Sequence, residues 1–220
     1  MSGFLDTLAE RPVLADGAMG SRIFARGVDP QVCYDALNLD RAALVASIHE
    51  EYRAAGAEVL ETNTFGANRF KLAAWGLEGR AADINRAGAE LARKAAGPGM
   101  WVAGSMGPLG RLDEEPDPEA VHQAFAEQAR ALAEGGADLI ILETFPGLTR
   151  LLAAVAAVRE ATDLPLVAQL VLTRQGRSLS GVDAGDCFRA LAAAGADVVG
   201  LNCGLGPLGA REALSRIPAQ

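Results

Sequence analysis

Cys203 lies in GLNCGLGP (200–207), where an apolar run ends and a glycine-rich segment begins. A thiol at the tip of a strand, next to a loop, can bind a metal ion or act as a nucleophile once it is ionised. Asn202 directly before it adds a polar amide at the same tip. The alternative is a buried thiol that packs as a small hydrophobic group. The residues alone leave both interpretations open.

Three carboxylates follow apolar runs in the same way. Asp16 begins DGAMG (16–20), Glu61 begins ETNTFGAN (61–68) and Glu143 begins ETF (143–145). The glycine amides after Asp16 can approach a ligand closely. Glu61 and Glu143 come straight after apolar residues, so each needs a partner, and Glu143 suits a substrate ammonium group. The simpler alternative is a set of ordinary polar turns.

The other reactive side chains are assigned no chemistry. His49 and His122 lie within helical stretches among Glu and Gln, so we expect both at the surface. Cys33 and Cys187 are expected to be structural. Three cysteines without a CxxC pair make a disulfide framework improbable and favour a reducing compartment.

Composition limits the function further. The 220 residues carry a formal net charge of −8, and the acidic groups are scattered. A nucleic-acid surface needs clustered Lys and Arg. The first residues lack the apolar core of a signal peptide, and no apolar stretch approaches the roughly 20 residues of a membrane span. We predict a cytoplasmic protein that handles small molecules, with no nucleic-acid or membrane partner, and leave oligomer formation open.

The elements that position these residues alternate along the chain. Short runs rich in Val, Ile and Leu predict buried parallel strands, and Ala-rich stretches of helical period predict helices between them. The predicted strands are 12–16, 57–63, 100–106, 138–144, 165–172 and 197–203. Predicted helices include 39–56, 117–136, 149–162 and 184–195. The β-α-β-α order predicts a parallel α/β fold.

A weak internal repeat supports this order. RAAGAEVLET, AEGGADLIILET and AAAGADVVGLN share one plan, in which a helix ends at Gly56, Gly136 or Gly195. Alanine, an acidic residue and a strand follow. The repeat therefore predicts one type of helix-to-strand junction, used three times.

The strand ends favour a barrel over a doubly wound sheet. Polar residues follow many strands, as they do on the catalytic face of a (β/α)₈ barrel, and no GxGxxG opens a helix after the first strand. These polar residues are Asp16, Thr62, Asn63, Ser105, Glu143, Thr144, Asn202 and Cys203. A full barrel has eight strands and about 250 residues. We therefore predict an incomplete barrel of about six β-α units.

The sequence resembles the homocysteine S-methyltransferase family. The matching stretches cover nearly the whole chain in the family's order: LADGAMGSRI, IHEEYRAAGAEVLETNTFGANRFKL, INRAGAELARKAA, VAGSMGP, GADLIILETF and GADVVGLNCGLGP. FGANRFKLAAWGLE, REATDLPLVAQLVL and VVGLNCGLGP are most similar to the N-terminal half of bifunctional bacterial proteins that join this domain to a methylenetetrahydrofolate reductase.

The resemblance implies a zinc-containing (β/α)₈ barrel that transfers a methyl group to the zinc-bound sulfur of homocysteine and gives methionine. It implies that Cys203 is a zinc ligand and that Asn202 helps to shape the metal site. It also implies that Glu143 receives the homocysteine amino group. Asp16 and Gly17 match the loop that holds the amino-acid end. The second-strand loop that lines the same pocket is matched by Thr62, Asn63 and Thr64.

One part of the family pattern has no match. The family's other two zinc ligands are adjacent cysteines near the end of the domain, and no Cys-Cys pair occurs here. We therefore expect residues 1–220 to form one homocysteine-binding methyltransferase domain, truncated at its C-terminal side, with one of three zinc ligands present.

The sequence leaves several alternatives for function. S-methylmethionine or S-adenosylmethionine is the expected methyl donor, with methyltetrahydrofolate and betaine as alternatives. The chain could instead be a catalytically incomplete fragment that retains amino-acid binding. A third alternative, an aldolase or phosphate-binding isomerase, would need a lysine at a strand end, whereas Lys71 and Lys94 lie in helical stretches.

Overall fold

The computed structural model describes residues 3–110 and 116–217. Its sheet contains five parallel strands in the order in which they occur along the chain. The strands are β1 (Val59–Glu61), β2 (Trp101–Met106), β3 (Leu139–Phe145), β4 (Leu166–Leu170) and β5 (Val198–Leu201). A doubly wound sheet reverses its strand order at a switch point, and this sheet does not. The predicted parallel α/β fold is confirmed, in the form of an incomplete (β/α)₈ barrel.

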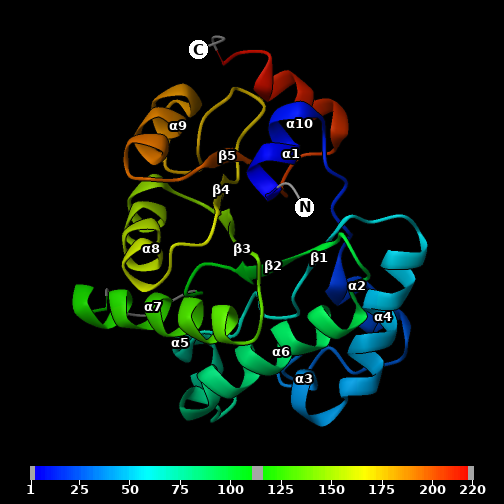
Figure 1. Ribbon diagram of the computed structural model, residues 1–220. Coiled ribbons are helices and arrows are strands. Elements are labelled where there is room, and N and C mark those ends of the chain that lie inside the picture. The colour runs from blue at the N-terminus through cyan, green and yellow to red at the C-terminus, as the bar shows by residue number, and fades with distance from the viewer. Residues whose placement is uncertain (1–2, 111–115, 218–220) are drawn as a thin grey trace.

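Helices cover the outer face of the sheet (Figure 1). The described helices are α1 (Phe4–Glu10), α2 (Met19–Ala25), α3 (Leu37–Asp40), α4 (Ala42–Ala54), α5 (Arg69–Ala73), η1 (Glu78–Arg80), α6 (Ala81–Ala95), α7 (Pro118–Glu134), α8 (Leu148–Ala161), α9 (Ala184–Ala193) and α10 (Pro207–Leu214). Neighbouring helices pack in the series α4, α6, α7, α8 and α9. The predicted helix 39–56 is divided between α3 and α4. No described helix combines the length and apolar character that crossing a membrane requires.

The inner face of the sheet changes from apolar to polar along each strand. Successive side chains of a strand point to opposite faces, so alternate residues share one face. Val59, Ala103 and Ile141 belong to one buried cluster, which Phe4 of α1 joins. The Phe4 ring packs edge-on against Trp101, with ring centroids 5.8 Å apart. Two residues after Val59, Ala103 and Ile141, the same face carries Glu61, Ser105 and Glu143. The apolar half of this face anchors the sheet, and the polar half lies at the carboxyl ends of the strands.

The repeated helix-to-strand junction has a physical cause. Gly56, Gly136 and Gly195 have φ angles of 98°, 95° and 106°, which a side chain would disfavour. In each repeat the acidic residue that follows accepts a hydrogen bond from a backbone N–H of the neighbouring strand segment, and it pairs with an arginine. The three pairs are Glu58 with Arg11, Asp138 with Arg93 and Asp197 with Arg159. The junction thus fixes where each strand begins relative to its neighbour.

The first predicted strand, 12–16, is wrong as a regular strand. It forms a single parallel bridge, between Ala15 and Val59. Pro12 has no N–H to donate. At the other end, the Asp16 carboxylate rather than the backbone accepts the hydrogen bond from Glu61 N, at 3.0 Å. The segment therefore lies beside β1, but ladder pairing ends after one bridge.

The surface position expected for His49 is also wrong. His49 is 0% exposed on α4, and neither ring nitrogen has a hydrogen-bond partner among the described residues. Burial lowers its pKa to about 4. His122 is partly exposed and pairs with Glu160 of α8, with 2.9 Å between Nε2 and Oε2. The two helices place these histidines differently because α4 turns the His49 side toward the interior.

Candidate functional site

A pocket of about 870 Å³ opens at the carboxyl ends of the strands. It gathers residues from all five strand ends or the loops that follow them, together with the loop before α2. All eight predicted site residues line this pocket: Asp16, Gly17, Thr62, Asn63, Thr64, Glu143, Asn202 and Cys203. The barrel topology explains this convergence, because parallel strands place their carboxyl ends on one face.

Glu143 is held by a side chain of the adjacent strand β2 and by one that directly follows β5. Ser105 Oγ donates a 2.6 Å hydrogen bond to Glu143 Oε1, and Asn202 Nδ2 donates a 2.9 Å hydrogen bond to Oε2. Strand β3 has a register irregularity between Leu142 and Phe145, and Thr144 within it has a φ of 62°. Bulges of this kind redirect side chains. The irregularity and the two hydrogen bonds together fix the Glu143 carboxylate.

Cys203 lies beside this network. Its side chain is exposed, and its backbone has a φ of 56°. Thr144 Oγ1 lies 3.4 Å from Cys203 Sγ as a donor, and Asn202 Nδ2 lies 3.6 Å away. Asn202 also bonds Thr144 twice, accepting from its backbone N at 2.7 Å and donating to Oγ1 at 2.8 Å. One amide therefore holds together the ends of β3 and β5.

The described residues do not by themselves complete a zinc site. Catalytic zinc typically takes three protein ligands and leaves a position for substrate. Across residues 3–110 and 116–217, no group of three His, Cys, Asp or Glu side chains is arranged to hold a metal ion. The exposed Cys203 thiol is a suitable single ligand in its chemistry and its position. The donor set around it is incomplete.

Two further carboxylates lie close to Glu143. Asp16 Oδ2 accepts the hydrogen bond from Glu61 N, whereas the buried Oδ1 has no hydrogen-bond partner within the described chain. Burial raises the pKa of Asp16 to about 7, and the charge of Glu143 adds to this rise. Burial, followed by the charges of Glu143 and Asp16, raises the pKa of Glu61 well above its usual range. This cluster of acids is suited to a cationic group, which would stabilise the ionised forms.

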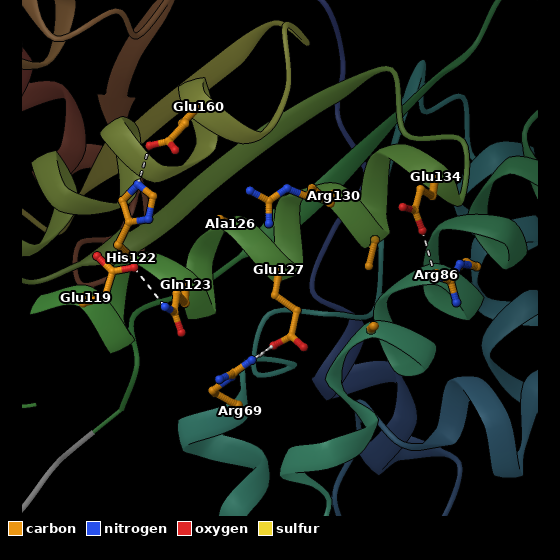
Figure 2. A pocket seen from close by; sticks show the side chains of 12 residues that line it. Arg69, Arg86, Glu119, His122, Gln123, Ala126, Glu127, Arg130, Glu134 and Glu160 are labelled. Atoms are coloured by element: carbon orange, nitrogen blue, oxygen red, sulfur yellow. Dashed lines mark hydrogen bonds and ion pairs between the residues drawn. The ribbon is translucent and has the colours of Figure 1, made fainter. Parts of the chain in front are cut away.

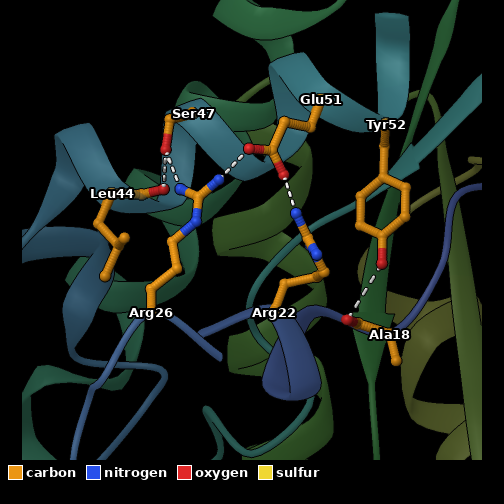
Figure 3. Close-up of polar contacts among 7 residues, drawn as sticks. All are labelled: Ala18, Arg22, Arg26, Leu44, Ser47, Glu51 and Tyr52. Carbon is orange, nitrogen blue, oxygen red and sulfur yellow. Dashed lines mark hydrogen bonds and ion pairs between the residues drawn. The ribbon is translucent and has the colours of Figure 1, made fainter. Parts of the chain in front are cut away.

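The loop that carries Asp16 is fixed by α4. Tyr52 Oη donates a 3.2 Å hydrogen bond to the carbonyl oxygen of Ala18, as Figure 3 shows. A Cβ at Gly17 would lie 2.9 Å from Tyr52 Oη, so only glycine fits there without a shift. In the same view Arg22 and Arg26 both reach Glu51, which ties α2 to α4. These contacts hold the Asp16–Gly17 turn at the pocket.

The polar side chains of Thr62, Asn63 and Thr64 are hydrogen bonded within the protein. Thr62 Oγ1 and Thr64 Oγ1 lie 2.5 Å apart, and Thr64 Oγ1 donates to Ser105 O at 2.7 Å. Asn63 Nδ2 donates to Tyr34 O at 2.8 Å. The three residues border the pocket and fix the loop after β1. Direct contact between these side chains and a substrate stays a prediction.

The pocket also contains residues that the sequence did not single out. Gln169 extends the inward-facing row of β4 two residues beyond Val167, so its position followed from the period of two. Lys71 lies on α5 and also lines the pocket, although its helical position argued against a role. No local signal could have placed Lys71, because the path of α5 at the pocket rim depends on the fold.

A second hollow of about 640 Å³ lies on the outer surface along α7. Figure 2 shows its charged side chains pairing between helices. The pairs are Arg69 with Glu127, Arg86 with Glu134 and His122 with Glu160. Exposed pairs of this type are common on helix surfaces and contribute little stability. This hollow contains none of the predicted site residues.

Comparisons with known proteins agree with the site. The sequence profile of the family described as homocysteine S-methyltransferase matches residues 13–220. The methionine synthase of Mycobacterium tuberculosis is 33% identical over 234 residues, which cover 97% of this chain and 20% of that protein. The methionine synthase of Mycobacterium leprae is 32% identical over 234 residues, covering 97% and 19%. The chain thus spans about a fifth of the length of these relatives.

Solved structures give the same result. The metallated form of the homocysteine methyltransferase MmuM from Escherichia coli has a TM-score of 0.85 and 26% identity, over 95% of this chain and 80% of that one. Its oxidized form has the same TM-score and identity, over 96% and 80%. Because the family profile matches almost the whole chain, and the fold and the relatives agree with it, the chain belongs to the homocysteine S-methyltransferase family.

Proposed function

We propose that this chain binds homocysteine in the pocket at the strand ends and serves the transfer of a methyl group to its sulfur, giving methionine. Membership of the family supports the reaction. One observation supports the placement of the substrate: Asn202 hydrogen bonds Glu143 and lies 3.6 Å from Cys203 Sγ. It connects a carboxylate suited to the substrate ammonium group with a thiol suited to the sulfur end.

The amino-acid end of homocysteine is assigned to the acid cluster and the glycine turn. Glu143 receives the ammonium group, and the neighbouring Asp16 and Glu61 add negative charge. The free Asp16 Oδ1 gives the cluster an unsatisfied acceptor. The amides that begin at Gly17 are available to the carboxylate. Thr62, Asn63 and Thr64 shape the wall beside it.

The sulfur end is assigned to Cys203 and Asn202. Zinc, when bound, would favour the thiolate form of the substrate, whose free thiol has a pKa of about 8.5. Cys203 would be the ligand that the described chain contributes. Because the described donor set is incomplete, we expect weak zinc binding by the 220-residue chain. Zinc titration should give a much weaker affinity for Cys203→Ser, while the buried Cys187→Ser serves as the control. Tight, stoichiometric binding would contradict the incomplete site.

The proposed donor is a sulfonium compound, S-methylmethionine or S-adenosylmethionine. The homocysteine thiol loses its proton to solvent, and its sulfur forms a bond to the methyl carbon while the bond between that carbon and the donor sulfur breaks. The electron pair of the broken bond stays on the donor, which becomes a neutral thioether. The described pocket is lined by four carboxylates and one lysine, a balance that suits a cationic donor. Methyltetrahydrofolate and betaine are the alternatives.

A second candidate is amino-acid binding without methyl transfer. It is favoured because, among the described residues, no group of three His, Cys, Asp or Glu side chains is arranged to hold a metal ion. In this case the acid cluster would hold homocysteine or methionine, and no methylated product would form.

Calorimetric titration with homocysteine and with methionine, with a chelator present, tests the binding step. We expect heat with homocysteine. In Glu143→Gln the affinity for homocysteine should fall at least about tenfold, because a charge-assisted hydrogen bond is lost. Glu160→Gln, on the outer face of α8, is the matched control. Absence of heat with either amino acid would remove both candidates. Binding combined with no methionine formed from S-methylmethionine and zinc would favour the second candidate.

A reducing, cytoplasmic setting is part of the same proposal. It is supported by the three free cysteines, Cys33, Cys187 and Cys203. Its partners are small-molecule substrates. A single domain spanning residues 1–220 stays a prediction.

A further inference from the structure

The pocket contains one basic side chain among the residues that the structure describes, and its position is unusual. Lys71 is half-buried, with Nζ 4.2 Å from the centroid of the Phe65 ring. It makes no hydrogen bond or ion pair through its ammonium group with any described residue. Lysine side chains ordinarily extend their charge into water. The Lys71 ammonium group instead lies at the pocket wall.

Several contacts hold the helix that carries Lys71, its stem and the ring beneath its ammonium group. Asn68 caps α5 by accepting a 3.0 Å hydrogen bond from Lys71 N. The stem passes close to Gly110, where a Cβ would lie 3.2 Å from Lys71 Cγ. The Phe65 ring packs onto Gly107 so closely that a Cβ there would lie 2.4 Å from the ring. The ammonium group therefore lies over a ring that packs closely against Gly107 on the pocket wall.

Acidic groups act on Lys71 from a distance without pairing with it. Burial lowers the pKa of Lys71, while the charges of Asp35 and Glu143 raise it. No carboxylate oxygen of the described chain comes within 4.0 Å of Nζ. Asp35 itself accepts a 2.9 Å hydrogen bond from Gly66 N and so holds the loop that carries Phe65. A half-buried cation without an anion has a desolvation cost that an anionic ligand group would offset.

We propose that Lys71 binds the carboxylate of the methyl donor and so selects a donor that is itself an amino acid. This inference rests on the proposed function, in which a sulfonium compound donates the methyl group. The pocket would then hold the two substrates at oppositely charged groups, with the homocysteine ammonium group at the acid cluster and the donor carboxylate at Lys71. Lys71 is then a specificity-determining residue and takes no part in breaking or forming the methyl bond.

The test compares two donors that differ in one group. S-methylmethionine carries the carboxylate, and (3-aminopropyl)dimethylsulfonium is the same molecule without it. Each is titrated calorimetrically into the full chain saturated with homocysteine, so that the homocysteine site is occupied. We expect the unsubstituted chain to bind S-methylmethionine at least about tenfold more tightly than the decarboxylated compound.

Lys71→Met keeps an apolar stem and removes the charge, so it should abolish this preference while leaving homocysteine affinity within about twofold. Lys71→Arg should retain part of the preference. The matched control is Lys94→Met, which removes the chain's other lysine from the exposed side of α6 and should retain all of it.

The outcomes separate the two proposals. Three results would overturn the role of Lys71 while homocysteine still binds and the proposed function stands. The unsubstituted chain could bind the two donors equally, or it could fail to bind S-methylmethionine. Lys71→Met could also keep the full preference for S-methylmethionine. Absence of homocysteine binding would contradict the proposed function and this inference with it. If Lys71→Met does not fold, the two donors on the unsubstituted chain and on Lys71→Arg still decide.

Discussion

Thr144 Oγ1 lies 3.4 Å from Cys203 Sγ, and these two residues are the non-glycine positions with positive φ in the described chain. Left-handed backbone at such residues costs roughly 1–3 kcal/mol and occurs most often at functional sites. Thr144 is the penultimate residue of β3 and Cys203 follows the end of β5. Asn202 hydrogen bonds Thr144 and directly precedes Cys203. The strain therefore falls where the proposed sulfur end of the substrate lies, and one amide holds it in place.

Replacing Asn202 with Ala should loosen this arrangement. The change leaves Thr144 N without its partner and leaves Glu143 Oε2 with only the 3.3 Å hydrogen bond from Thr144 Oγ1, so we expect the free energy of unfolding to fall by about 1–3 kcal/mol. Homocysteine binding should weaken as well, because Glu143 would lose the hydrogen bond from Asn202 that helps to hold its carboxylate. Urea denaturation and calorimetry measure the two effects. Gln175→Ala, at an exposed loop position, is the control; an equal loss in both variants would refute the role assigned to Asn202.

The raised pKa of Asp16 predicts a specific pH dependence. The folded protein keeps a proton that the unfolded chain loses near pH 4, so stability falls as pH rises from about 4 through about 7. Asp16→Asn cannot lose this proton, and it should reduce the slope over that window. Urea denaturation between pH 4 and 8 compares the two proteins. Parallel curves would show that Asp16 does not titrate in this range.

The same carboxylates should release protons when homocysteine binds. A bound ammonium group stabilises the ionised acids and lowers their pKa values. Near pH 7 the binding heat should therefore differ between buffers of different ionisation enthalpy. The difference should decrease in Asp16→Asn. A heat that is independent of the buffer would argue against an ammonium group in the acid cluster.

The buried His49 predicts the opposite pH dependence, in which stability falls as the pH becomes acidic. Its folded pKa of about 4 lies below the value of 6.5 expected when exposed, so stability is present above pH 6.5 and is lost as pH falls toward 4. The loss amounts to about 3 kcal/mol. His49→Leu removes the buried titratable ring and should unfold less readily than the unsubstituted chain at pH 4.5. His122→Leu, at a partly exposed position, should show no such protection. Equal acid sensitivity in all three proteins would be the contrary result.

Gly17→Ala should disturb the turn that carries Asp16. The added Cβ would lie 2.9 Å from Tyr52 Oη and 3.0 Å from its Cε1, so the ring or the turn must shift. We expect homocysteine binding to weaken severalfold, and the hydrogen bond from Tyr52 to Ala18 to be lost. Gly79→Ala is the matched control, because a Cβ there meets no atom within 4 Å. Calorimetry that finds equal affinity in both variants would show that the turn tolerates the shift.

Much of the fold and site followed from local patterns. The Gly56, Gly136 and Gly195 junctions were predictable because a positive φ after a helix selects glycine. Glu143, Asn202 and Cys203 were predictable as neighbours because parallel strands bring their carboxyl ends to one face. The failure at 12–16 was not predictable, since the Asp16 side chain replaces the backbone acceptor only once β1 lies beside it.

The sequence by itself determined the strand and helix order, the barrel arrangement and the polar residues at the strand ends, because periodicity, glycine and chain direction act locally. Only the tertiary structure decided that His49 is buried, that Thr144 meets Cys203, and that Lys71 enters the pocket over Phe65. These facts depend on how separate segments pack. A helix presents all its faces in the sequence, and the packing of its neighbours decides which face is buried and which one borders the pocket.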